Sequence, residues 1–104
     1  MQLEIEKIYL SAEQSSDDDF DYNNGNTDVL VKLQNGDTYV AAFFTYQQIP
    51  SLIQEHQQNG AYLQGAYFQA PNMLLIDTCQ PERVRRVVKH LMEEGDFLQV
   101  FRKL

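Results

Sequence analysis

The most unusual stretch of this sequence is an acidic segment between residues 11 and 28, SAEQSSDDDFDYNNGNTD. Two aromatic residues, Phe20 and Tyr22, stand among its carboxylates. Aromatic side chains are frequent anchors of protein interfaces, and carboxylates gathered in one place attract a basic partner. We therefore predict a partner-binding loop that is made of six residues, Asp17, Asp18, Asp19, Phe20, Asp21 and Tyr22.

The same segment also has a spacing that could suit calcium. Four oxygen-bearing residues stand at alternate positions, Asp17, Asp19, Asp21 and Asn23, and Asp28 occupies the twelfth position of a loop that starts at Asp17. Calcium binds several oxygens that converge from one flexible loop. However, Tyr22 stands where such a loop needs a glycine, and the flanking residues are typical of strands. A calcium-responsive module is therefore an alternative, and no metal ligand is assigned.

Cys79 is the second candidate for chemistry. Five residues separate it from Arg85, which is the spacing of the cysteine phosphatases, whose thiolate and backbone amides bind phosphate. The intervening QPERV has no glycine, and Pro81 lacks an amide donor. Cys79 could form a catalytic pair with His56 or His90 only if the fold brings the two side chains close together. We assign no catalytic residue and no cofactor. The second alternative is a small enzyme or ligand-binding domain that uses Cys79 or a carboxylate in a pocket.

Charge and composition narrow the class of partner and the location. Fifteen acids and eight bases give a net charge of −7, which disfavours nucleic acids and anionic membranes as partners. A single cysteine suits a reducing compartment, and acids stand where a signal peptide would carry bases. We expect a cytoplasmic protein with a basic protein partner. The charge asymmetry between the acidic residues 1–28 and the more basic residues 82–104 leaves a homodimer open.

The hydrophobic pattern of the first half predicts strands and one helix. Alternating apolar residues predict a strand over 2–10 with a bulge near Lys7. Two β-rich runs, 28–34 and 37–46, flank Asn35-Gly36, which predicts a hairpin with a type I′ turn. Apolar residues at helical spacing predict a helix over 48–59.

The second half continues the alternation of strands and helices. A second hairpin is predicted from 67–70 and 73–77, with its turn at Pro71-Asn72. The clearest helical pattern covers 81–94, and a final strand is predicted over 97–101.

Together these elements predict one α+β domain over residues 1–104, with a long acidic loop at 11–28. The order is β-β-β-α-β-β-α-β. Short connections predict a largely antiparallel sheet of about six strands with two helices packed on one face.

Residues 28–97 resemble small uncharacterised bacterial acidic α+β proteins, through DVLVKLQNGDTYVAAFFTY, YFQAPNMLLID and LMEEGDF. Some proteins of this type are immunity proteins of polymorphic toxin systems. The resemblance implies a bacterial cytosolic setting and a protein partner, and it transfers no site residue. We therefore expect a protein-binding module, most concretely an immunity-type protein that neutralises a basic, nucleic-acid-cleaving toxin through its acidic surface.

Overall fold

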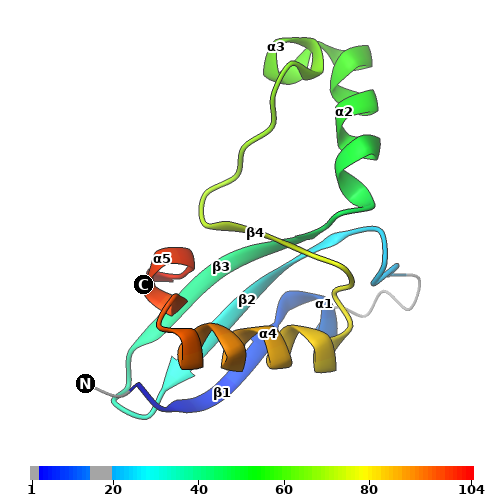
Figure 1. The fold of residues 1–104 in the computed structure, drawn as a ribbon. Coiled ribbons are helices and arrows are strands. Elements are labelled where there is room, and N and C mark those ends of the chain that lie inside the picture. The colour runs from blue at the N-terminus through cyan, green and yellow to red at the C-terminus, as the bar shows by residue number, and fades with distance from the viewer. Residues whose placement is uncertain (1–2, 15–19) are drawn as a thin grey trace.

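The computed structural model describes residues 3–14 and 20–104, and these form an α+β fold around one sheet of five strands (Figure 1). The elements in chain order are β1 (Ile5–Leu10), α1 (Ser11–Gln14), β2 (Asn26–Leu33), β3 (Thr38–Thr45), α2 (Gln48–Asn59), α3 (Ala61–Gly65), β4 (Met73–Ile76), α4 (Pro81–Glu94), α5 (Phe97–Val100) and β5 (Arg102–Lys103).

The sheet has the order β1-β2-β3-β4, and the short β5 also pairs with β3. The β1–β2, β2–β3 and β3–β5 pairs are antiparallel, whereas β4 runs parallel to β3. A parallel pair needs a long crossover, which residues 46–72 supply here. A largely antiparallel sheet is thus confirmed, and the expected sixth strand is not found among the described residues.

The first hairpin forms as predicted, but its turn is of another type. Only Gly36 of the Asn35-Gly36 pair has a positive φ, +94°. The amide of Gly36 donates to the carbonyl of Leu33 (3.0 Å), and the amide of Leu33 donates to the carbonyl of Asp37 (2.9 Å). A three-residue loop with a left-handed glycine therefore replaces the predicted type I′ turn. The predicted bulge in β1 is confirmed by a register shift between Ile5 and Lys7.

Two predicted strands are wrong. Residues 67–70 form no strand, and β4 pairs with β3 instead of with them. Phe68 of this segment packs against Phe44 of β3 at a centroid distance of 5.4 Å. Residues 97–100 form a helical turn. This turn brings Phe97 and Phe101 into a stack with a centroid distance of 4.5 Å, which an extended strand would hold too far apart.

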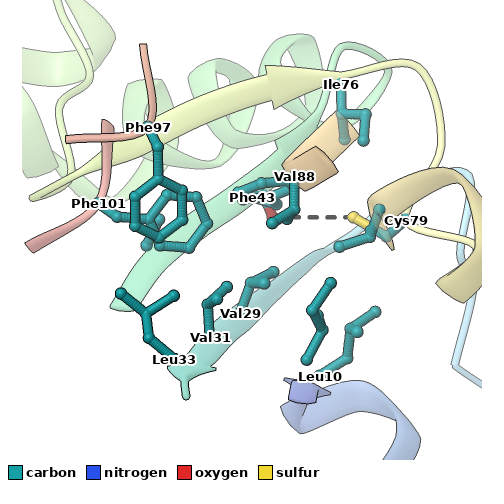
Figure 2. Packing of buried hydrophobic residues seen from close by; sticks show 13 residues of the cluster. Leu10, Val29, Val31, Leu33, Phe43, Ile76, Cys79, Val88, Phe97 and Phe101 are labelled. Atoms are coloured by element: carbon teal, nitrogen blue, oxygen red, sulfur yellow. Dashed lines mark hydrogen bonds between the residues drawn. The ribbon is translucent and has the colours of Figure 1, made fainter. Parts of the chain in front are cut away.

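The main core lies on one face of the sheet, beneath α4 (Figure 2). Val84 and Val88 of α4 pack with Phe97, Phe101 and the inward-facing side chains of β1, β2 and β3. The second expected helix, α2, contributes no residue to this core, so the prediction of two helices on one face holds only for α4.

Residues 46–72, which we call the arm, project away from the sheet (Figure 1). The arm contains α2, α3 and an extended return to β4. It makes the molecule elongated, with extents of 46 × 29 × 21 Å and a radius of gyration of 14.8 Å, against about 13 Å for a compact domain of this size. Within the described residues, no helix has the length and apolarity that crossing a membrane requires.

Candidate partner-binding site at the acidic end of the sheet

The strand directions bring several acidic residues to one end of the sheet. β1, β3 and β4 all end there and β2 begins there, because β2 is antiparallel to β1 and β3 while β4 is parallel to β3. The strand ends and the segments that join them carry five described acids at this end, which we call the acidic end: Glu13, Asp21, Asp28, Asp77 and Glu82.

The first part of the acidic segment is a helical turn, α1, and not the loop that we predicted. Its position is fixed by Thr27 at the start of β2, whose side chain is buried. The amide of Ala12 donates to Thr27 Oγ1 (3.0 Å), and the hydroxyls of Ser11 and Thr27 lie 3.1 Å apart. The amide of Asp28 donates in turn to Ser11 Oγ (3.0 Å). The segment therefore leaves the sheet in a defined direction.

The last part of the segment is fixed by its backbone. The carbonyl of Tyr22 accepts hydrogen bonds from the Cys79 amide (2.7 Å) and the Thr78 hydroxyl (3.2 Å). Gly25 and Thr45 exchange two more, from Thr45 N to Gly25 O (3.0 Å) and from Gly25 N to Thr45 Oγ1 (3.1 Å). Residues 20–25 are thus held against the ends of β3 and β4.

The two predicted aromatic anchors touch each other. The rings of Phe20 and Tyr22 form a T-shaped pair with centroids 4.9 Å apart, and both residues are half-buried. Tyr22 also packs against the main core. Tyr22 therefore has a structural role, and the exposed part of the pair is what a partner could reach.

Two arginines of α4 neutralise part of the acidic end. Arg85 makes a two-pronged contact with Glu13, at 2.8 Å from Nη2 to Oε1 and 3.3 Å from Nη1 to Oε2. Arg83 Nε lies 3.4 Å from Asp77 Oδ1. The remaining three acids of this end, Asp21, Asp28 and Glu82, are exposed and form no ion pair with a described residue. The described part of this end therefore keeps an excess of negative charge.

No known protein family, curated protein or solved structure matches this chain. The resemblance to immunity proteins therefore stays a prediction. What can be said of the site comes from its own geometry.

Half of the predicted partner-binding residues can be placed. Phe20, Asp21 and Tyr22 lie together at the acidic end, while Asp17, Asp18 and Asp19 lie outside the described residues. The carboxylate of Asp21 accepts a hydrogen bond from the Asn23 amide (2.9 Å). Among residues 3–14 and 20–104, no group of three or more acidic, histidine or cysteine side chains is arranged to hold a metal ion. The calcium hypothesis depends on Asp17 and Asp19 and stays a prediction.

Cys79 is sealed in the core. Its side chain has no exposed surface, and its thiol lies 3.8 Å from the carbonyl oxygen of Phe43 (Figure 2). Burial raises the pKa of the Cys79 thiol from 9.0 to about 11, because the apolar surroundings disfavour the thiolate. Almost no thiolate exists at neutral pH, and a substrate has no path to it. This environment opposes the alternative in which Cys79 is a nucleophile.

The other members of the suggested catalytic groups lie elsewhere. The guanidinium of Arg85 is engaged by Glu13 and by the carbonyl of Ile8 (3.3 Å), so it makes no phosphate cradle with Cys79. His56 is buried in the arm, where its ring lies 4.5 Å from that of Tyr62. His90 is exposed on α4. The structure therefore brings none of the suggested cysteine–histidine pairs together.

A pocket at the opposite end of the sheet has a volume of about 560 Å³. Leu3, Met92 and Phe97 contribute its apolar walls, and Lys89 and Glu93 lie at its margin. Cys79 does not line it. The pocket thus offers apolar surface but no arrangement of reactive groups.

Sequence reasoning missed the two threonines that hold the acidic end together. Thr27 and Thr45 are both buried. The hydroxyl of Thr27 accepts a hydrogen bond from the amide of Ala12. The hydroxyl of Thr45 accepts one from the amide of Gly25 and one from the amide of Gln48 at the start of the arm (3.3 Å). Each stands at a position of a strand where an apolar residue would be expected, and that misfit was the available signal.

Proposed function

We propose that this chain is a protein-binding module that neutralises a basic, nucleic-acid-cleaving toxin, as an immunity protein does. The observation that supports it is the acidic end, which carries exposed carboxylates and an aromatic pair on a loop that hydrogen bonds attach to the sheet. Such a surface imitates the charge of a nucleic acid backbone, and a basic active site would be drawn to it.

The attachment of the loop matters for the affinity of this contact. Four hydrogen bonds hold residues 20–25 in place. Thr78 and Cys79, just after β4, donate to the carbonyl of Tyr22, and Thr45 of β3 exchanges two hydrogen bonds with Gly25. A loop held in place loses less conformational entropy when it binds, so more of the contact energy appears as affinity. The aromatic pair of Phe20 and Tyr22 would then anchor the partner while the carboxylates orient it.

The first test is to find the partner and to measure how its affinity depends on the acidic loop. Affinity capture from lysate of the native host, at low and moderate salt, should yield a basic protein that is lost as salt rises. The dissociation constant is then measured for a variant in which four aspartates become asparagine, Asp17, Asp18, Asp19 and Asp21. We expect this variant to bind at least about tenfold more weakly and with a shallower salt dependence.

A matched control removes the same number of charges from the other end of the sheet. Its substitutions are Glu4→Gln, Glu93→Gln, Glu94→Gln and Asp96→Asn, all at exposed positions. If the control weakens binding as much as the loop variant does, net charge alone explains the affinity and the acidic end is not the interface. If the captured protein's nuclease activity continues when the complex forms, the neutralisation part of the proposal fails.

A further inference from the structure

Much of the apolar surface of the arm is left uncovered by the rest of the chain. One face of α2 carries Ile49, Leu52, Ile53 and His56, and of these only His56, a polar residue, is buried. The rings of His56, Tyr62 and Phe68 pack against one another, with centroids 4.5 Å apart for His56 and Tyr62, 5.7 Å for His56 and Phe68, and 5.3 Å for Tyr62 and Phe68. This small aromatic cluster holds the arm together and leaves the aliphatic side chains of α2 half-exposed.

The tip of the arm is a strained left-handed turn. Tyr62, Leu63 and Gln64 have φ values of 53°, 53° and 58°, which cost about 1–2 kcal/mol for each residue that is not glycine. Such strain persists only where the surroundings fix it, and it often marks a functional segment. Here it holds the side chain of Leu63 in solvent, where 77% of the residue's surface is exposed.

A groove of about 250 Å³ runs between the arm and β4. Ile49, Ile53, Tyr67 and Phe68 line it from the arm, and Met73 and Leu75 line it from the strand. Tyr67 is 53% exposed and Leu75 is 40% exposed. Tyr46 and Leu63, at the base and the tip of the arm, are also exposed.

Charge is almost absent from this part of the molecule. Residues 46–76 contain one charged residue, Glu55, although the chain as a whole has fifteen acids and eight bases. The buried centres of protein interfaces are depleted of charge and enriched in tyrosine, phenylalanine and methionine. The groove is lined by no charged residue, and Tyr67, Phe68 and Met73 are part of its lining.

β4 adds an unprotected sheet edge to the groove. Among the described strands it pairs only with β3, and its sequence, MLLI, has no charge, bulge or proline to prevent further pairing. Exposed edges normally carry such features, because a free edge is a template for another strand. Two copies of one edge strand can meet about a two-fold axis, since antiparallel strands have that symmetry.

The charge distribution indicates which protein covers this surface. Two copies of a chain with a charge of −7 repel each other, and this repulsion opposes association least where the contact surface carries no charge. The groove and β4 provide such a surface, whereas a basic protein would be attracted to the acidic end. We propose that the groove between the arm and β4 is the interface of a homodimer, in which a second copy of this chain packs its own arm and β4 against the first about a two-fold axis.

The oligomeric state of the intact chain tests this proposal. Sedimentation velocity over a concentration series should show a dimer for the wild type. Leu75→Lys and Tyr67→Lys should each raise the dimer dissociation constant by about tenfold or more, because both copies carry the substitution and the dimer would bury two unpaired charges in an apolar contact. Leu98→Lys is the control, since Leu98 is an apolar residue of α5 that is 60% exposed outside the groove.

Three results would overturn the proposal. One is a wild type that stays monomeric at its highest soluble concentration. Another is a dimer that tolerates both groove substitutions. The last is a dimer that Leu98→Lys dissociates equally, which would place the contact elsewhere or make it nonspecific.

A cross-linking measurement covers the case in which the lysine variants misfold. Cys79 is buried, so a cysteine introduced at an exposed position is the reactive one. With a short bismaleimide, Leu75→Cys should form a covalent dimer in high yield, while Leu98→Cys should give little. Equal yields at the two positions, or no covalent dimer from Leu75→Cys, would contradict a two-fold contact at β4.

Discussion

At the scale of single residues, Cys79 joins the acidic loop to the core. Its amide donates to the carbonyl of Tyr22 at 2.7 Å, while its thiol points among core side chains and has no exposed surface. The backbone of Cys79 therefore helps to hold the candidate site in place, while its side chain is too buried to react. Cys79 and Arg85 have the spacing of the cysteine phosphatases, but they have separate structural roles. Arg85 pairs with Glu13, and Cys79 is part of the core.

The buried thiol predicts how stability changes at high pH. The pKa of Cys79 is raised to about 11 in the folded chain, so the unfolded chain loses this proton first as the pH rises. The free energy of unfolding is unaffected by the thiol below pH 9 and should fall by about 2–3 kcal/mol as the pH rises through about 11. Denaturant unfolding followed by circular dichroism measures this loss.

Tyrosines and lysines also titrate in this range, so the effect of Cys79 is read as a difference. Cys79→Ala removes the thiol, and the pH profile of the variant is subtracted from that of the wild type. A difference that stays constant from pH 8 to pH 11 would show that the thiol is not desolvated as the structure indicates.

At the scale of elements, Gly65 ends the left-handed turn and brings it against α2. Its φ is +81°, and a Cβ there would lie 2.8 Å from the carbonyl oxygen of Ile53 and 2.9 Å from Cγ of Gln57. Gly60 is a useful comparison, because its φ is +82° but a Cβ would meet nothing within 4 Å. Both glycines are required by backbone conformation, and only Gly65 is also required by space.

This difference predicts unequal effects of two matched substitutions. Gly60→Ala should lower the free energy of unfolding by about 1 kcal/mol, from the left-handed conformation alone. Gly65→Ala should cost about 1–3 kcal/mol more, since backbone must also move. Thermal or denaturant unfolding gives both values, and equal losses would mean that the turn does not pack on α2 as described.

The elements that sequence predicted correctly are those whose pattern and local signals agree. α2 and α4 have apolar residues at helical spacing and end at glycines with positive φ, and the first hairpin has two β-rich runs around Asn35-Gly36. The two strands predicted wrongly, 67–70 and 97–101, each contain two aromatic residues. Their conformation is set by which ring each aromatic side chain meets, a tertiary choice that local pattern does not contain.

At the scale of the whole molecule, charge is divided between two surfaces of different character. The acidic end has exposed carboxylates beside an aromatic pair, and the groove and arm have almost no charge. The acidic segment could be recognised from sequence as a run of aspartates. The groove could not, because it depends on β4 pairing with β3 in parallel, although the lack of charge over residues 46–76 was a visible sign.

The two surfaces predict opposite responses to salt. Screening weakens the attraction between the acidic end and a basic partner, so its dissociation constant should rise as NaCl is increased from about 50 to about 500 mM. The same screening reduces repulsion between two copies with a charge of −7, so the homodimer should become tighter by a few-fold. Both constants can be measured on one protein preparation, by sedimentation for the dimer and calorimetry for the partner. A dimer that dissociates as salt rises would show that charged groups hold it. Its interface would then lie between the acidic end of one copy and the basic residues of α4 in the other, and not at the groove.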